Sequence, residues 1–425
     1  MSSADKDRIV VTGMGAVSPL GSGVETIWSR LLAGRSGIGS LGAELTAGTG
    51  CEVGGRVPDR IQDPEAGFDS AGVIAPKDLK KMDRFVEFAL VAAHEALQQA
   101  GWHDADEWGR LRTATVIATG IGGFGSIVNA VHITDTRGPS RMSPFTAPTF
   151  LANMAAGQAS IHYGFRGPQG APVTACAAGV QAIGDAARLI RSGEADIALC
   201  GGAEAAMGRV SLGGFAAAKA LSTSFNDAPQ TASRPFDEQR DGFVMSEGAG
   251  LLVIERLGHA LARGAKPLAE LVGYGTTSDA YHLTSCPEDG NGARRAMEMA
   301  LAQAGITPAQ VNHINAHATS TQVGDRAELA AIRSLFGSRP DLLISATKSS
   351  TGHLLGAAGG IEAIFTVLAL RDRVAPATLN LLRPDPLSEG LLVVSERPRK
   401  ANIEFALTNG FGFGGVNASA VFRRL

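Results

Sequence analysis

The stretch Val173-Thr174-Ala175-Cys176-Ala177-Ala178-Gly179 decides the fold assignment, because an apolar, strand-like run ends there and a helix begins. Apolar residues recur at helical spacing from 180 to 190, and Gly193 ends the pattern. A thiol at this junction faces the positive end of the helix dipole and free backbone N–H groups, which favour the nucleophilic thiolate. The alternative is a buried packing thiol, since free cysteine is among the most buried residue types.

Working outward, short β-rich runs alternate with helical patterns. The runs are 113–118, 197–200 and 250–254, and the helical patterns are 85–100, 179–192, 292–304 and 360–371. This alternation predicts α/β layers around a largely parallel sheet. A helix end and connection at 259–267 divides the chain into residues 1–259 and 260–425. Residues 352–360 head a second helix rich in small residues, an echo of the Cys176 segment that suggests two related halves.

Composition excludes several classes of protein. Of the 425 residues, 44% are hydrophobic and 19% charged, and the formal net charge of −3 argues against a nucleic-acid binder. The polar N-terminus lacks a signal-peptide core, and no run of about 20 apolar residues predicts a membrane span. The cysteines are widely spaced, which suits a reducing cytosol better than disulfides or structural zinc. They are Cys51, Cys176, Cys200 and Cys286.

Two other motifs are weak. Residues 120–125 fit GxGxxG but lack the acidic residue expected about 20 positions later, and residues 410–415 lead into a strand, so we expect no nucleotide site. His313 and His317 have the i,i+4 spacing of a metal pair, but the glutamate of HExxH is absent and the local pattern is that of a strand end. We therefore predict no metal site.

Four polar side chains stand in apolar or small-residue surroundings: Cys176, His317, Lys348 and His353. Each alone has an ordinary structural explanation, but together they suit thioester chemistry followed by carbon–carbon bond formation. A thiolate accepts an acyl group, and backbone N–H groups hold the oxyanion. Two histidines stabilise the enolate that a malonyl thioester forms on losing CO2. A Cys-His-Asn hydrolase needs only one histidine, so the second is informative.

Several ordered motifs carry a resemblance to a known family. They are Thr174-Ala175-Cys176, Arg234-Pro235-Phe236-Asp237, residues 240–244, Asn315-Ala316-His317, and residues 348–359 and 409–417. With these the chain resembles the β-ketoacyl-acyl-carrier-protein synthases of type II, the bacterial elongating condensing enzymes, over nearly all of residues 9–422. The resemblance implies a thiolase-like α/β fold of five αβαβα layers built from two duplicated halves. It also implies a homodimer.

The resemblance implies roles for individual residues. Cys176 is the acyl acceptor, His317 and His353 assist decarboxylation and condensation, and Lys348 has Glu328 as its partner. The amides of Cys176 and Phe411 form the oxyanion hole, and Phe411 also gates acyl entry. Ile121 lies at the base of the acyl pocket. The threonines beside the phosphopantetheine arm are Thr284, Thr319 and Thr321, and the residues facing the acidic carrier protein are Lys77, Lys80, Lys81, Arg141 and Lys219.

The predicted reaction is the decarboxylating condensation of an acyl chain on Cys176 with malonyl-acyl-carrier protein in fatty-acid elongation. No cofactor is expected beyond the phosphopantetheine that the carrier protein delivers, and the enzyme is expected in the cytoplasm. One alternative is the same chemistry in a specialised pathway, for a polyketide or a nodulation-type acyl chain. A non-catalytic chain-length partner would lack the Cys, and a thiolase would have a second reactive Cys near the C-terminus, where residues beyond 286 contain none.

Overall fold

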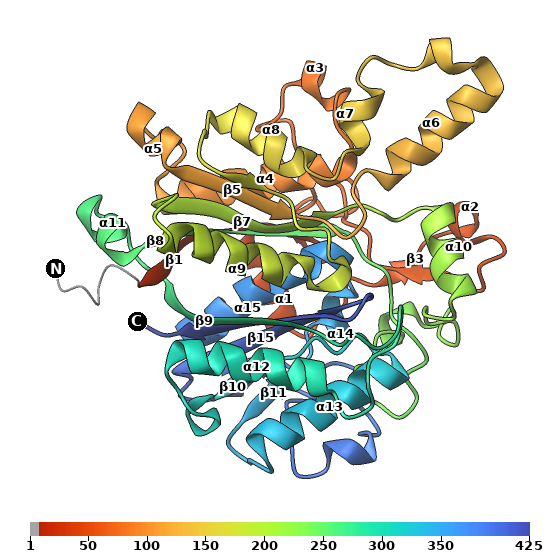
Figure 1. Ribbon diagram of the computed structural model, residues 1–425. Helices are drawn as coiled ribbons and strands as arrows, with labels where there is room; N and C mark the ends of the chain where they lie inside the picture. Colours follow the sequence, from red (N-terminus) through yellow and green to blue (C-terminus); the bar gives the residue numbers. More distant parts are fainter. Residues whose placement is uncertain (1–7) are drawn as a thin grey trace.

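A computed structural model describes residues 8–425 and contains one large mixed sheet (Figure 1). The strands of the first half are β1 (Ile9–Ser18), β5 (Thr113–Ala118), β6 (Gln169–Gly170), β7 (Ile197–Glu204) and β8 (Gly248–Arg256). Those of the second half are β9 (Ala269–Ser278), β10 (His313–Asn315), β11 (Leu343–Ser345), β13 (Leu392–Val393), β15 (Phe405–Gly412) and β16 (Val416–Arg423).

The order across the sheet is β6-β5-β7-β8-β1-β9-β16-β15-β10-β11-β13, so the second half repeats the first in reverse order. The two halves are joined where residues 9–11 of β1 pair with residues 269–271 of β9. The prediction of a largely parallel sheet is wrong, because the central strands β7, β8, β1, β9, β16 and β15 pair antiparallel and only the outer strands pair parallel. Residues 413–415 join β15 to β16 in a tight turn, which requires antiparallel pairing.

Helices make the remaining layers, and the predicted five-layer α/β architecture is confirmed (Figure 1). The middle layer contains α9 (Ala178–Arg191) and α15 (Ala358–Asp372), which lie between the two groups of strands and form the centre of the largest apolar core. The outer layers contain α4 (Arg84–Ala100) and α8 (Met154–Tyr163) on one side, and α12 (Asn291–Ala304) and α13 (Gln322–Phe336) on the other. Each outer layer has its own apolar cluster against the sheet.

Glycines on β1 and β9 let the outer helices approach the sheet closely. A Cβ at Gly15 would lie 1.9 Å from the carbonyl oxygen of Ala92 on α4, and a Cβ at Gly275 would lie 2.1 Å from that of Ala296 on α12. Any side chain at either position would therefore push the helix off the strand. The same device in equivalent places of both halves accounts for part of the glycine content and supports a common origin of the halves.

The predicted elements agree closely with the structure. All four predicted helices are present within two residues of their expected ends, as α4, α9, α12 and α15, and the three predicted strands are β5, β7 and β8. Residues 171–174, which read as strand-like before Cys176, are irregular instead. The predicted boundary at 259/260 falls inside the short helix α11 (Leu257–Ala262) and stays a prediction.

The shorter elements border the sheet or form the loops around the site. They are α1 (Val24–Leu32), α2 (Ala43–Thr46), α3 (Pro76–Leu79), α5 (Glu107–Leu111), α6 (Phe124–Arg137), α7 (Thr146–Phe150), α10 (Arg209–Ala217), α14 (Lys348–Thr351), β2 (Gly21–Ser22), β3 (Gly39–Ser40), β4 (Val53–Gly54), β12 (Val374–Ala375) and β14 (Arg399–Lys400). Over residues 8–425, none of the helices has the length and apolar character needed to cross a membrane.

Candidate active site

Cys176 lies in a strained turn at the head of the central helix α9. The preceding residue, Ala175, has φ 49°, a left-handed conformation that costs a non-glycine residue energy, and a single 3₁₀ turn (Ala175–Ala177) leads into the helix. The second half has the same device: Leu355 also has φ 49°, and a 3₁₀ turn (Leu355–Ala357) leads into α15. The sequence echo between residues 176 and 352–360 is therefore a structural repeat.

A cavity of about 560 Å³ opens onto Cys176. It lies at the carboxyl ends of β10 and β15 and at the heads of α9 and α15, so both halves of the chain contribute to its wall. The residues that the sequence predicted as catalytic and that line it are Cys176, His317, His353 and Phe411. The three predicted pantetheine threonines, Thr284, Thr319 and Thr321, line it as well.

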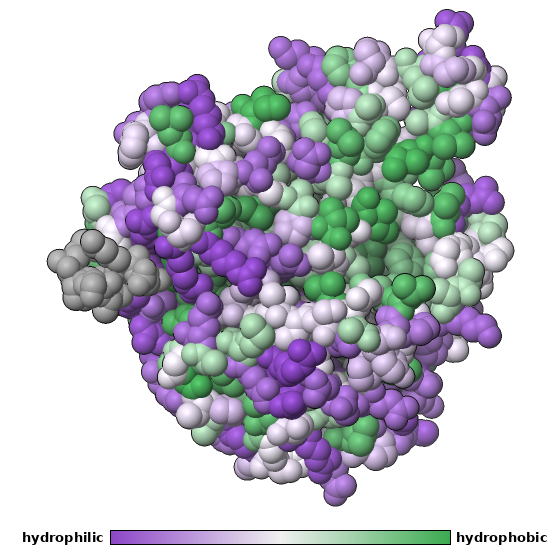
Figure 2. Space-filling model, viewed as in Figure 1, coloured by the Kyte–Doolittle hydropathy of each residue, from purple (hydrophilic) through white to green (hydrophobic). Residues whose placement is uncertain are grey.

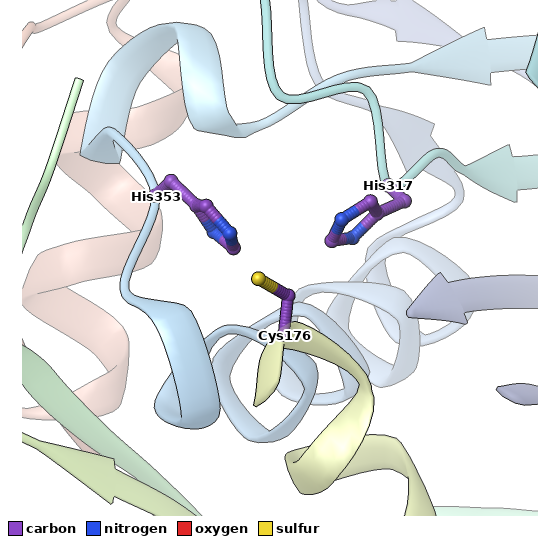
Figure 3. A group of neighbouring side chains, drawn as sticks. All are labelled: Cys176, His317 and His353. Carbon is purple, nitrogen blue, oxygen red and sulfur yellow. The ribbon is translucent and has the colours of Figure 1, made fainter. Parts of the chain in front are cut away.

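Cys176, His317 and His353 point toward one another (Figure 3). The sulfur and one ring nitrogen of each histidine all lie within 4.8 Å of one another. The two imidazole rings are nearly perpendicular, at 86°, with centroids 5.4 Å apart. The thiol comes from the head of α9, and the imidazoles come from the loops that follow β10 and α14. The structure therefore brings together three side chains that are up to 177 positions apart, from residues 176 to 353.

Both imidazoles are neutral in this site. Burial lowers the pKa of His317 well below its usual value, and the positive charge of Lys348 and the nearby His353 lower it further. Burial and Lys348 likewise lower the pKa of His353. Neither ring nitrogen of His353 has a hydrogen-bond partner among residues 8–425, although the residue is only 2% exposed. Burying two polar nitrogens without hydrogen-bond partners costs free energy, and such groups are typical of ligand-binding sites.

Lys348 is buried beside His317, with its Nζ 3.4 Å from His317 Nδ1. An ammonium group has only protons to donate, so Nδ1 accepts and the proton of the neutral ring lies on Nε2, which faces the cavity. The prediction that Lys348 pairs with Glu328 is wrong. Lys348 instead forms a buried ion pair with Glu362, which points inward from α15.

Glu328 holds the backbone around His317. Its carboxylate accepts from the N–H groups of His317 at 2.9 Å and Ala318 at 2.7 Å, and from the side-chain amide of Asn409 at 3.0 Å. Burial raises its pKa, and these hydrogen bonds oppose the shift. Glu328 therefore fixes the position of the imidazole through its main chain, without contacting the lysine as an ion pair.

Burial at Cys176 opposes the thiolate that a helix head favours. Burial raises the pKa of Cys176 to about 12, and the charge of Lys348 opposes that shift without cancelling it. The N–H groups of Cys176 and Phe413 also favour the thiolate. The prediction that the amides of Cys176 and Phe411 form the oxyanion hole stays a prediction. The ring of Phe411 lies against His317, with centroids 5.6 Å apart.

Glu204, at the end of β7, is a fully buried carboxylate that the sequence analysis missed. It accepts from the N–H of Gly120 at 2.6 Å, from the N–H of Gly356 at 3.0 Å and from the hydroxyl of Thr119 at 3.0 Å. Burial raises its pKa to about 7 against these hydrogen bonds. It therefore ties the loop before Ile121 to the turn after His353. The sequence does carry a signal for Glu204, because it is the single acid at the end of a strand that otherwise contains apolar residues and glycines.

The remaining predicted residues divide into two groups. Ile121 packs against the apolar cluster that also contacts Cys176, but it is not part of the cavity wall. Lys219 borders the cavity, whereas Lys77, Lys80 and Lys81 lie at or just after α3, which stands well apart from α10 and the Lys219 segment in Figure 1. Arg141 is exposed after α6. The five basic residues do not form one continuous patch within this chain.

A layered α/β duplication with a cysteine and two neutral histidines at its centre defines a class of acyl-transferring condensing enzymes, and the sequence comparisons agree. Residues 6–260 match the beta-ketoacyl synthase N-terminal domain, and residues 268–382 match the C-terminal domain. The chain belongs to the β-ketoacyl synthase family. It is 48% identical to 3-oxoacyl-[acyl-carrier-protein] synthase 2 of Rhizobium meliloti (strain 1021), over 98% of this chain and 99% of that protein.

Solved structures show the same fold. A β-ketoacyl synthase from Burkholderia phymatum STM815 has a TM-score of 0.89 at 32% identity, covering 98% of this chain and 99% of that one. A ketosynthase of a type II polyketide system, in complex with its acyl-carrier protein and bound to the hexaketide, has a TM-score of 0.88 at 32% identity, with the same coverage. The thiolase-like fold expected from the sequence is confirmed.

Proposed function

We propose that this protein condenses an acyl chain, held as a thioester on Cys176, with malonyl-acyl-carrier protein to give 3-oxoacyl-acyl-carrier protein and CO2. One observation carries the proposal: the Cys176 sulfur and two neutral imidazoles lie within 4.8 Å of one another at a cavity. A protein that only measures chain length needs no nucleophile there.

The first step is acyl transfer. The Cys176 sulfur attacks the carbonyl carbon of the incoming thioester, and the backbone amides of Cys176 and Phe411 are the oxyanion donors in this proposal. The bond to the pantetheine sulfur then breaks, and the proton of the Cys176 thiol leaves with the pantetheine as a new thiol. Because the raised pKa keeps Cys176 protonated, this proton must move during the attack. His353, whose ring nitrogens have no hydrogen-bond partner among residues 8–425, is the available relay.

The second step is decarboxylation and condensation. The thioester oxygen of the malonyl group accepts from Nε2–H of His317, which Lys348 holds in this tautomer, and from His353. The bond to the carboxylate breaks and releases CO2, leaving an enolate that these donors stabilise. The enolate carbon attacks the acyl carbonyl, the Cys176 sulfur leaves, and it takes one proton from the solvent. Decarboxylation supplies the carbanion, so neutral donors are sufficient and no strong base is needed.

The carrier-protein part of the proposal rests on the cavity entrance. Thr319 and Thr321, whose hydroxyl oxygens are 3.1 Å apart, and Thr284 present polar groups along a path that a pantetheine arm would follow. Lys219 is exposed at the same entrance and suits an acidic partner. The related polyketide ketosynthase was solved with its acyl-carrier protein.

A homodimer is supported by an unusual apolar surface. Figure 2 shows apolar surface gathered around α6 and the segment that follows it. Isolated exposed apolar residues are ordinary, but a cluster of them indicates an interface. The exposed residues are Ile127, Val128, Val131, Met142, Phe145 and Leu151.

The four cysteines are all free thiols, which fits a reducing compartment such as the cytoplasm.

Fatty-acid elongation is the favoured pathway, because two 3-oxoacyl-[acyl-carrier-protein] synthases are 48% and 45% identical to this chain, whereas the polyketide ketosynthase is 32% identical. The test is intact-protein mass after mixing with an acyl-carrier protein bearing a medium-length chain, followed by malonyl-acyl-carrier protein. We expect an acyl adduct that disappears as 3-oxoacyl product forms. Cys176→Ala should give no adduct, and Cys286→Ser, in the same cavity, should behave as the native enzyme. Equal labelling of Cys176→Ala would refute the mechanism.

A further inference from the structure

Arg240 is one of the largest fully buried side chains of the protein, and the condensation mechanism gives it no role. It is not part of the cavity wall. Its guanidinium donates to the carbonyl oxygens of Thr321 at 3.1 Å and Gln322 at 3.2 Å, two residues that do line the cavity. We propose that Arg240 positions the threonine turn, residues 319–322, to bind the pantetheine arm, an inference that rests on the proposed function.

Three aspartates hold the guanidinium of Arg240 in place. Nη1 donates to the carbonyl oxygen of Asp237 at 2.6 Å, and Nη2 donates to the carboxylate of Asp385 at 2.8 Å. The buried carboxylate of Asp325 lies 3.4 Å from Nε. Buried ion pairs add little stability over apolar packing, so the main contribution of this network is the fixed geometry of its hydrogen bonds. A lysine has one compact charge and cannot reach all these acceptors at once.

The backbone of the threonine turn is strained, and further hydrogen bonds support it. Ser320 has φ 72°, which a residue with a Cβ rarely adopts, and it is fully buried. Its N–H donates to Asp325 at 3.1 Å, and its hydroxyl oxygen accepts from the N–H of Arg234 at 3.0 Å. Its carbonyl oxygen accepts from the N–H of Gly242 at 3.2 Å. The segment that contains Arg240 therefore holds the turn at more than one point.

The hydroxyl of Thr321 is not used by its own helix. Thr321 is the N-cap of α13, but its side chain makes no capping hydrogen bond, and its hydroxyl oxygen lies 3.1 Å from that of Thr319. A Cβ at Gly324 would lie 2.7 Å from the same oxygen, so the glycine leaves room for it. Two neighbouring hydroxyls at the cavity wall suit the amide groups of pantetheine. A shift of the turn would move both hydroxyls away from the arm.

Protection of Cys176 from alkylation tests the proposal without turnover. The probe is S-methylpantetheine, which carries neither a thiol nor an acyl group. Iodoacetamide labelling, measured by mass spectrometry of the peptide that contains Cys176, gives the probe concentration that halves the labelling rate. Arg240→Lys should raise this half-protecting concentration about tenfold, the effect of one lost hydrogen bond, and leave the labelling rate without probe unchanged. An unchanged half-protecting concentration would overturn the proposal.

Thr321→Val separates positioning from a general structural role, because it removes the hydroxyl and keeps the side-chain shape. It should raise the half-protecting concentration by itself. Since Arg240 acts through this threonine, the double variant should show clearly less than the product of the two single effects, and a full product would overturn the proposal. Ser320→Ala loosens the same turn without removing a charge, so it answers the question even if Arg240→Lys does not fold. No change in Ser320→Ala would also count against the proposal.

Arg30→Lys is the matched control. The Arg30 side chain is 12% exposed, donates to the carbonyl oxygen of Leu20 at 2.9 Å and pairs with Asp63 and Glu65. None of these residues lines the cavity, so protection should stay at the native level, and a rise equal to that in Arg240→Lys would overturn the proposal. The assay involves no acyl transfer, so a failed acyl-adduct experiment leaves its result standing. A native enzyme that the probe does not protect would overturn the path of the arm and this inference together.

Discussion

Replacing Lys348 by methionine is expected to destabilise the protein strongly, because the replacement leaves Glu362 buried without its counter-charge. The side chains of Lys348 and Glu362 are 1% and 2% exposed, and Glu362 Oε2 has no hydrogen-bond partner among residues 8–425. Removing one member of such a pair typically costs about 3–5 kcal/mol. The double variant Lys348→Met/Glu362→Gln carries no buried charge at either position, and we expect it to recover most of that loss.

The loss should depend on pH in a defined direction. Burial already raises the pKa of Glu362 to about 7 while Lys348 lowers it, so removing the lysine raises it further. The folded pKa then lies above the unfolded value near 4.5. Folding therefore favours the protonated carboxyl, and this stability is fully present below the unfolded pKa and is lost as pH rises through the folded one. Between pH 6 and pH 8 Lys348→Met should lose up to roughly 2.7 kcal/mol relative to the double variant.

Urea unfolding followed by circular dichroism, at one protein concentration and at pH 6 and pH 8, measures these differences. Arg166→Met is the matched control, because its ion pair with Glu107 is 58% and 64% exposed and should contribute less than about 1 kcal/mol. A Lys348→Met variant within about 1 kcal/mol of the native protein at pH 8 would contradict a costly unpaired charge at Glu362. A double variant no more stable than the single one would contradict it as well.

Three further changes address the acyl pocket, the buried carboxylate and the carrier protein. Ile121→Gly should extend the longest acyl chain accepted in a chain-length panel, and an unchanged limit would place the pocket elsewhere. Glu204→Gln places an amide donor against the N–H of Gly120 or Gly356 and should lower the free energy of unfolding in urea by about 1–3 kcal/mol. A loss below about 0.5 kcal/mol would contradict the stabilising role of these hydrogen bonds. Lys219→Glu should raise the KM for acyl-carrier protein, and this increase should be smaller at high salt. The KM for a free acyl-pantetheine thioester should not change, and an equal increase for both substrates would refute a role of Lys219 in docking.

The layers and the nucleophile were predictable because their signals are local. Apolar periodicity and glycine stops give α4, α9, α12 and α15, and a cysteine at a helix head among small residues is visible without a structure. The strand directions were not predictable, because parallel and antiparallel pairing of a buried strand use similar apolar residues. The short turn at residues 413–415 was the available sign of antiparallel pairing.

The partners of the site residues were less accessible. Glu328 and Glu362 are both buried acids on helices near Lys348, and only the packing of α15 into the centre shows which one pairs with it. Glu362 does carry a signal, since it is the only charged residue in the largely apolar run from 360 to 370.

The same burial that makes the histidines useful makes the cysteine difficult to ionise, and the duplicated fold accounts for both. Each half contributes one strained turn and one central helix, and their meeting places the half-buried Cys176 beside the buried His317 and His353. In that environment the imidazoles lose their charge, which suits hydrogen-bond donors to an enolate, while the thiol keeps its proton. A permanent thiolate would attract a proton onto the imidazoles and remove their neutral form. A thiol that ionises only as the acyl carbonyl arrives avoids this effect, so the raised pKa of Cys176 suits the neutral imidazoles beside it.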